Sequence, residues 1–215
     1  MFPLCDIFPA GLNPAVQVFF LNWVTVKNGV LLFFYQDKRV NLATEYWASR
    51  RHLVPVSSGI WLVYEGFAAQ VRYLFIGGSA ADILCFCQFN PDWLKGDCTV
   101  AFAALGLLPN AAQIVFLKER FHNAKTHTLF ENGITGRVTD CKIALWQKGK
   151  DASFMVINDQ VQITYKNRRY KIPVAVFSLN RFETAIGIRS KIRTHKPKGC
   201  PGSYHEFFVS NQNRR

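Results

Sequence analysis

The chain has 215 residues, of which 49% are hydrophobic and 19% charged, so it can bury a substantial core, and extensive disorder is excluded. Its six cysteines stand in a chain too long and too rich in core residues to depend on disulfide bridges, and no CxxC pair is present to hold a structural zinc ion. The formal net charge is +12, and its position along the chain is informative.

The excess positive charge belongs to the second half of the chain. Residues 1–100 contain seven Lys or Arg and seven Asp or Glu, whereas residues 101–215 contain nineteen basic and seven acidic residues. Because a protein that needs only solubility can spread its charge, this concentration favours an anionic partner that docks on the second half. We therefore expect a neutral β-rich half over residues 1–95 and a basic α+β half over residues 96–215, which one compact domain can still combine.

The N-terminal residues, MFPLCDIFPAGLNP, lack the basic and apolar regions of a secretory signal. The apolar stretch 15–35 is interrupted by Asn22 and again at 27–29, too soon for a membrane span. We expect a soluble intracellular protein, cytoplasmic or nuclear and not secreted.

The clearest turn in the first half is Asn28-Gly29, because both residue types accept the positive φ angles of a tight hairpin. Apolar side chains occupy both faces of the flanking stretches, which predicts a sheet covered on each side. A short helix is expected at 41–51. The expected strands of this half are 16–26, 30–35, 59–64, 70–76 and 83–89, the last three as a meander.

Capping residues mark the helices expected in the second half. Asp97 can cap a helix that ends near residue 107, and Asn110 with Gln113 forms a capping-box pattern for the next helix. The same pattern at Asn180 predicts a last helix that ends near residue 192, followed by a basic tail. The expected strands are 134–139, 142–147, 152–157 and a hairpin over 161–177. The predicted fold class is α+β, with two mainly antiparallel β regions flanking a central helical pair and with a C-terminal helix.

The hairpin 161–177 is predicted to hold cations in solvent at its tip. Apolar and polar residues alternate on both arms, and Pro173, which cannot donate a ladder hydrogen bond, suits an edge strand. Its turn carries Lys166, Arg168 and Arg169. Such a tip can contact phosphate groups, but cations on an edge strand can also serve only to prevent aggregation.

Cations and aromatic rings together suggest a nucleic-acid interface in the second half. Cations follow a phosphate backbone, and flat rings such as Trp146 and Tyr165 stack on bases. The same pattern also fits core aromatics beneath a solvated basic surface. The predicted contact residues for RNA or another polyanion are Lys148, Lys150, Lys166, Arg168, Arg169, Tyr170, Arg189, Lys191, Arg193, Lys196 and Lys198.

Cys98 lies in the first turn of the helix predicted from Asp97, where the helix dipole favours a thiolate nucleophile. The stretch from Asp97 to Gln113 is similar to one branch of the papain-like peptidases, and the resemblance implies a cysteine hydrolase. The chain departs from that pattern in having Thr99 and Val100 after the cysteine and no histidine at the start of a following strand. The candidate bases are then His195 and His205, provided that the tail folds back.

A third reading uses Glu131, Asp140 and Lys142, which resemble a metal-assisted phosphodiester site if Asp140 and Lys142 share a strand. Asp140 also suits a turn and Lys142 an exposed face. His122 and His127 lack a third ligand, so neither a metal site nor a cofactor is predicted.

The sequence therefore predicts a non-catalytic binding protein that engages RNA or another polyanion through its basic half. A cysteine hydrolase with Cys98 as nucleophile is the first alternative. A structural subunit of a larger complex, with a protein partner on the apolar N-terminal half, is the second.

Overall fold

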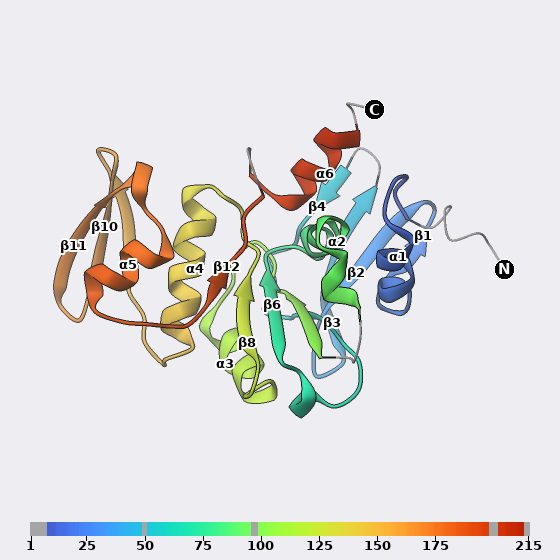
Figure 1. The fold of residues 1–215 in the computed structure, drawn as a ribbon, viewed down its shortest axis with the longest axis horizontal. Coiled ribbons are helices and arrows are strands. Elements are labelled where there is room, and N and C mark those ends of the chain that lie inside the picture. The colour runs from blue at the N-terminus through green and yellow to red at the C-terminus, as the bar shows by residue number, and fades with distance from the viewer. Residues whose placement is uncertain (1–7, 49–50, 96–98, 198–201, 213–215) are drawn as a thin grey trace.

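The computed structural model describes residues 8–48, 51–95, 99–197 and 202–212 and shows an α+β fold (Figure 1). Over these residues the chain forms six α-helices and three sheets, two antiparallel and one mixed. The predicted α+β class and the C-terminal helix are confirmed.

The helices are α1 (Pro14–Phe20), α2 (Ala80–Phe89), α3 (Ala111–Arg120), α4 (Ile134–Trp146), α5 (Leu179–Ile186) and α6 (Tyr204–Gln212). The strands are β1 (Thr25–Lys27), β2 (Val30–Asp37), β3 (Val40–Ala48), β4 (Arg51–Leu53), β5 (Trp61–Tyr64), β6 (Tyr73–Gly77), β7 (Val100–Ala104), β8 (Lys125–Thr128), β9 (Ser153–Ile157), β10 (Gln160–Tyr165), β11 (Arg168–Pro173) and β12 (Arg193–Thr194).

An antiparallel sheet in the order β1-β2-β3-β4 opens the fold. The predicted hairpin turn is confirmed, because Asn28 and Gly29 both have positive φ angles, 52° and 73°, between β1 and β2. Its first arm is shorter than expected. Asn13 caps α1, with Pro14 in the first turn, so the strand predicted from residue 16 begins only at Thr25.

One face of this sheet packs on the core. Leu31, Phe33 and Tyr35 of β2 are fully buried there, whereas Tyr46 and Leu53 on the opposite face are exposed. The sequence predicted cover on both faces, and the structure differs on the side of Tyr46, where the side chains are exposed or only half-buried.

The mixed sheet has the order β12-β8-β6-β7-β5, with only β5 antiparallel to its neighbour. Helix α2 packs on one face of this sheet, and α3 with α4 packs on the other. Since β6 pairs with both β7 and β8, the sheet joins residues from both sides of position 95.

Several predicted elements take another form in the structure. The stretch 83–89, expected as a strand, lies in α2, and the helix expected at 41–51 falls mostly within β3. The helix expected at 97–107 is replaced by β7, and the strands expected at 134–139 and 142–147 are one helix, α4. Two antiparallel sheets are observed, one in each predicted β region, but a third, mixed sheet joins the two halves, and in the described chain the stretch 99–107 does not form the first helix of the expected central pair.

The C-terminal module consists of β9, β10, β11, α5 and the part of α4 against which they pack. The hairpin predicted at 161–177 is confirmed as β10 and β11, with Pro173 at the end of edge strand β11. Phe177 and Phe182 fill the core of the module. Ser178 caps α5, two residues before the predicted cap, and Gly187 ends the helix with a φ of 71°.

In the part of the chain that is described, no helix is both long and apolar enough to cross a bilayer.

Candidate functional site

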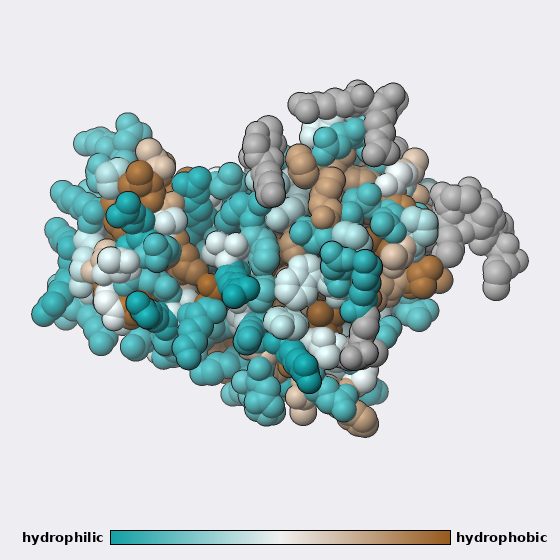
Figure 2. Space-filling model, viewed as in Figure 1, coloured by the Kyte–Doolittle hydropathy of each residue, from teal (hydrophilic) through white to brown (hydrophobic). Residues whose placement is uncertain are grey.

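The basic end is a set of seven exposed cations on, or directly after, three connecting segments of the C-terminal module. These segments are the link from α4 to β9, the turn between β10 and β11, and the link from α5 to β12, and all three lie along the lower border of the module in Figure 1. The register agrees, because Ser153 at the start of β9 pairs with Thr164 next to the β10–β11 turn. Figure 2 shows this border covered mainly by hydrophilic residues. The seven residues are Lys148, Lys150, Lys166, Arg168, Arg169, Arg189 and Lys191.

Few carboxylates lie close enough to neutralise the cations of the basic end. In the described chain, ion pairs join His52 to Glu45, Lys95 to Asp92 and Lys196 to Asp140, and none includes a residue of the basic end. Two carboxylates lie close by: Asp151 accepts a hydrogen bond from the Ala152 N–H, and Glu183 accepts one from the Ser190 N–H. Seven cations against two carboxylates leave this end strongly positive.

The other predicted contact residues are placed differently. Arg193 is exposed on β12. Lys196 is engaged, because its Nζ lies 2.8 Å from Asp140 Oδ2 and donates to the carbonyl oxygens of Phe130 and Glu131. Lys198, like Cys98, lies outside the described residues.

The predicted stacking rings are not available on the surface. Tyr170 is half-buried against the module core, and Trp146 and Tyr165 are buried. Tyr204 and Phe208 are buried as well, in the core beside α2. Among its described residues, the C-terminal module therefore offers charge to a phosphate backbone but no fully exposed ring for a base.

The sequence reading missed Lys171, which belongs to the same surface. Arg169 pairs with Thr164 and Lys171 with Gln162, so these four side chains share the outer face of the β10–β11 pair. Two residues along a strand span about 6.8 Å, so Arg169 and Lys171 present two neighbouring cations on this face. The alternation of β11 was the available signal, since every second residue after Arg169 faces the same way.

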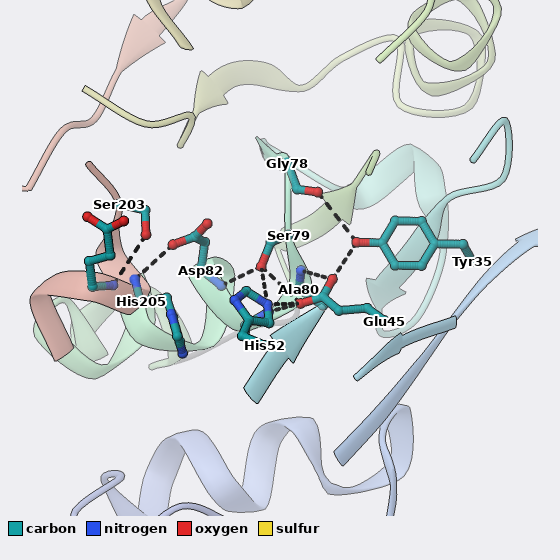
Figure 3. A network of polar contacts seen from close by, with 11 residues as sticks. Tyr35, Glu45, His52, Gly78, Ser79, Ala80, Asp82, Ser203 and His205 are labelled. Atoms are coloured by element: carbon teal, nitrogen blue, oxygen red, sulfur yellow. Dashed lines mark hydrogen bonds and ion pairs between the residues drawn. The ribbon is translucent and has the colours of Figure 1, made fainter. Parts of the chain in front are cut away.

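A second polar site, which the sequence reading missed entirely, surrounds the buried carboxylate of Glu45 (Figure 3). Five groups donate to it or pair with it: the Tyr35 hydroxyl at 2.5 Å, the Ser79 hydroxyl at 2.9 Å, the backbone N–H groups of Ala80 and Ala81 at 2.8 and 3.0 Å, and His52 Nε2 at 2.8 Å. The two backbone donors are the free N–H groups at the start of α2. Glu45 therefore connects the N-terminal sheet to the helix that covers the mixed sheet.

The hydrogen bonds decide the charge of Glu45. Burial alone raises the pKa of its carboxyl, but the hydrogen bond and charge of His52, with the bonds from Tyr35 and Ala81, outweigh burial and bring the pKa below its ordinary value. Burial of the Tyr35 hydroxyl and the charge of the nearby Glu45 carboxylate raise the pKa of Tyr35. Glu45 is thus a buried anion held by donors.

Ser79, His52 and Glu45 have the residue types of a hydrolytic triad but not its geometry. Ser79 Oγ lies 3.3 Å from His52 Nε2, and Glu45 Oε1 lies 2.8 Å from the same nitrogen. A triad requires the carboxylate and the hydroxyl on opposite ring nitrogens. Ser79 instead caps α2 by accepting from the Asp82 N–H and donates to Glu45, so this cluster is an anchor.

A hollow of about 310 Å³ lies beside this anchor at the carboxyl ends of β6 and β8, the position where ligands bind in open α/β sheets. Its wall includes Asp82 and His205, and the His205 N–H donates to Asp82 at 2.8 Å. Burial raises the pKa of Asp82 to about 6, although the bonds from His205 and Ser203 act against it. Burial and the neighbouring His52 lower the pKa of His205 to about 4.

The predicted metal-assisted site is not assembled. Asp140 and Lys142 lie on helix α4, where residues two apart point in different directions. Asp140 pairs with Lys196, and the Lys142 Nζ lies 5.5 Å from the centre of the Trp146 ring. Across the residues described, no cluster of three or more His, Cys, Asp or Glu side chains is positioned to hold a metal ion.

His127, His195 and the three cysteines of the described residues have structural surroundings. The Nε2 of His195, directly after β12, lies 2.8 Å from the Nδ1 of His127 on β8, and burial lowers the pKa of both rings. Cys85, Cys87 and Cys141 are free and buried, and burial raises the pKa of each thiol. The helix whose dipole was expected to activate Cys98 is not formed from Val100 onward, because Val100–Ala104 is strand β7.

The fold and these sites define an α+β protein with a mixed central sheet and a cationic C-terminal module. No protein-family model matches the chain, and no curated protein matches it either.

Proposed function

We propose that the protein binds RNA or a chemically similar polyanion, and that the basic end contacts its phosphate backbone. The observation that carries this proposal is the gathering of seven exposed cations, on or directly after three separate connecting segments, at one end of the C-terminal module. Lys171 beside Arg169 extends this surface over the outer face of the sheet. Such a surface attracts phosphates without reading bases.

The lack of exposed rings shapes the expected binding mode. A single strand gains much of its affinity from base stacking, worth about 1–3 kcal/mol per base, and the aromatic residues near the basic end are buried or half-buried. A duplex presents its phosphates without stacking. We therefore expect the protein to bind duplex RNA at least as tightly as single strands and with little sequence preference.

The test is a fluorescence anisotropy titration with a labelled RNA duplex of about 20 base pairs and its separate strand, at several salt concentrations. We expect affinity to fall steeply with salt, and the double substitution Arg168→Glu and Arg169→Glu to weaken binding at least tenfold. Removing two phosphate contacts also lowers the slope of log K against log salt by about 2.

The chain supplies a matched control. Lys38 and Arg39 form the turn between β2 and β3, where both residues have positive φ angles, as Lys166 and Asn167 do in the β10–β11 turn. Lys38→Glu with Arg39→Glu makes the same charge change on the neutral half and should leave affinity almost unchanged. Equal losses in both double variants, or a flat salt response, would contradict a localised binding end.

A further inference from the structure

A groove runs along α4 where the mixed sheet meets the C-terminal module. The loop after β7 forms one wall, α4 forms the floor, and β9 forms the other wall. The apolar side chains that shape it are Leu108, Ile134, Val138, Trp146, Phe154 and Val156. We call this feature the α4 groove.

The dimensions of the α4 groove suit a peptide. Ile134, Val138, Lys142 and Trp146 are spaced by four residues, so they form one ridge on the helix, about 18 Å long from first to last. The hollow has a volume of about 300 Å³, at the lower end of the range for ligand sites. It therefore holds a few side chains from a short segment.

The exposed side chains of the α4 groove are apolar to an unusual degree. Leu107 is 58% exposed, Leu108 66% and Val156 52%. Single exposed apolar residues are ordinary, but several that line one depression mark an interaction site. The groove lies at the seam between the core of the mixed sheet and the core of the C-terminal module, and no segment of the described chain fills it.

Charge indicates what kind of segment fits. Lys142 is the one charged residue among those lining the groove, and its position over the Trp146 ring places its ammonium group along the floor. Lys148 and Lys150 lie exposed just beyond the C-terminal end of the same helix. A complementary partner presents apolar side chains to the floor and carboxylates to these cations.

We propose that the α4 groove binds an acidic amphipathic segment of a partner protein, a helix whose apolar residues follow the spacing i, i+4, i+7. A nucleobase fits less well, because the lining is mostly aliphatic and the Trp146 ring is 8% exposed, with Lys142 over it. The groove floor is separate from the sheet face that carries Arg169 and Lys171, and only its C-terminal end borders Lys148 and Lys150 of the basic end, so a partner protein in the groove lies beside a bound polyanion.

The test uses three fluorescein-labelled peptides of about 16 residues, long enough to form a helix over the 18 Å ridge. The first has leucines at i, i+4 and i+7 flanked by glutamates, the second replaces the glutamates by lysines, and the third replaces the leucines by serines. We expect the first to bind, and the other two to bind at least tenfold more weakly. Methyl NMR signals of Ile134, Val138 and Val156 should shift only with the first.

Protein variants locate the contact. Leu108→Asp should weaken binding of the acidic peptide at least tenfold, and Lys142→Glu should reverse the preference between the acidic and the basic peptide. Phe67→Asp is the matched control, because Phe67 is a 75% exposed apolar residue in another part of the molecule and outside the groove. Thermal unfolding of each variant checks that it is folded, and reversal by Lys142→Glu cannot arise from misfolding.

Three results would overturn the proposal. The first is equal binding of all three peptides, or no binding of the acidic one. The second is displacement of the acidic peptide by an RNA duplex from the Arg168→Glu, Arg169→Glu variant, which would make the groove a nucleic-acid site. The third is a dimer in sedimentation that Leu108→Asp dissociates, which would make a second copy of the chain the occupant.

Discussion

At the scale of single residues, Glu45 shows how one buried charge can join two parts of a fold. Its donors come from β2, β4 and the start of α2, so its removal leaves several buried polar groups without partners. We expect Glu45→Gln to lower the free energy of unfolding at pH 7 by about 3–5 kcal/mol, as when one partner of a buried ion pair is lost. Urea denaturation monitored by circular dichroism measures this loss.

The pH dependence of that loss follows from the pKa of Glu45. Because folding lowers this pKa below 4.5, the carboxylate contributes its full stability above that pH, and the contribution disappears as pH falls through the folded-state value. The difference between Glu45→Gln and the parent protein should therefore shrink when the pH is lowered from 7 to 4. Glu119→Gln, at an exposed position of α3, serves as control and should change stability little at either pH. A constant difference would mean that the Glu45 carboxyl has the same pKa in the folded and the unfolded protein.

At the scale of elements, Gln113 shows that a local capping pattern can also anchor a helix at long range. It forms the capping box of α3 with Asn110, and its Nε2 lies within 3.2 Å of the carbonyl oxygens of Ser57, Gly59 and Leu105. Asn110→Ala should cost about 1 kcal/mol, the usual value of a cap. Gln113→Ala should cost about 2–3 kcal/mol, because it also leaves buried carbonyl groups without a donor.

Gln113→Glu separates the two roles in the same unfolding measurement. Glutamate at this position still accepts from the Asn110 N–H, as a capping box requires, but it cannot donate to the three carbonyl groups. We expect it to be at least as destabilising as Gln113→Ala. A Gln113→Glu protein as stable as the parent would show that only the cap matters.

The elements that could be predicted are those whose signals lie close together in sequence. The Asn28-Gly29 turn, the capping box at Asn110 and the alternation in 161–177 each depend on residues a few positions apart. Helix α2 was misread because nearly all of its residues are buried, so no polar face reveals its period. Strand β3 was misread because Glu45 faces the core and Tyr46 faces solvent, which inverts the expected pattern.

The site was less predictable than the fold for a related reason. The cations of the basic end could be named from the sequence, but their meeting at one border depends on where three segments end in space. The rings expected to stack are buried, because Trp146 and Tyr165 face cores that only the tertiary structure defines. The partners of Glu45 lie up to 36 positions away, and no local pattern indicates them.

At the scale of the whole molecule, the uneven charge has a thermodynamic consequence. Seven cations at the basic end repel one another in the folded protein more than in the extended unfolded chain, and the described chain has only one ion pair between exposed residues, Lys95 with Asp92. Proteins held by surface ion pairs lose stability as salt screens them. Here screening should mainly relieve repulsion, so added salt should stabilise the fold.

We therefore expect the free energy of unfolding in urea to rise by roughly 1 kcal/mol between low ionic strength and about 0.3 M potassium chloride, where the Debye length falls below 8 Å. Lys148→Gln with Lys150→Gln should raise stability at low salt and flatten this dependence, because it removes two of the repelling charges. Lys38→Gln with Arg39→Gln, in the neutral half, should leave the dependence as it is in the parent protein. If the two double variants respond to salt alike, the repulsion is spread over the surface, and the basic end has no special electrostatic character.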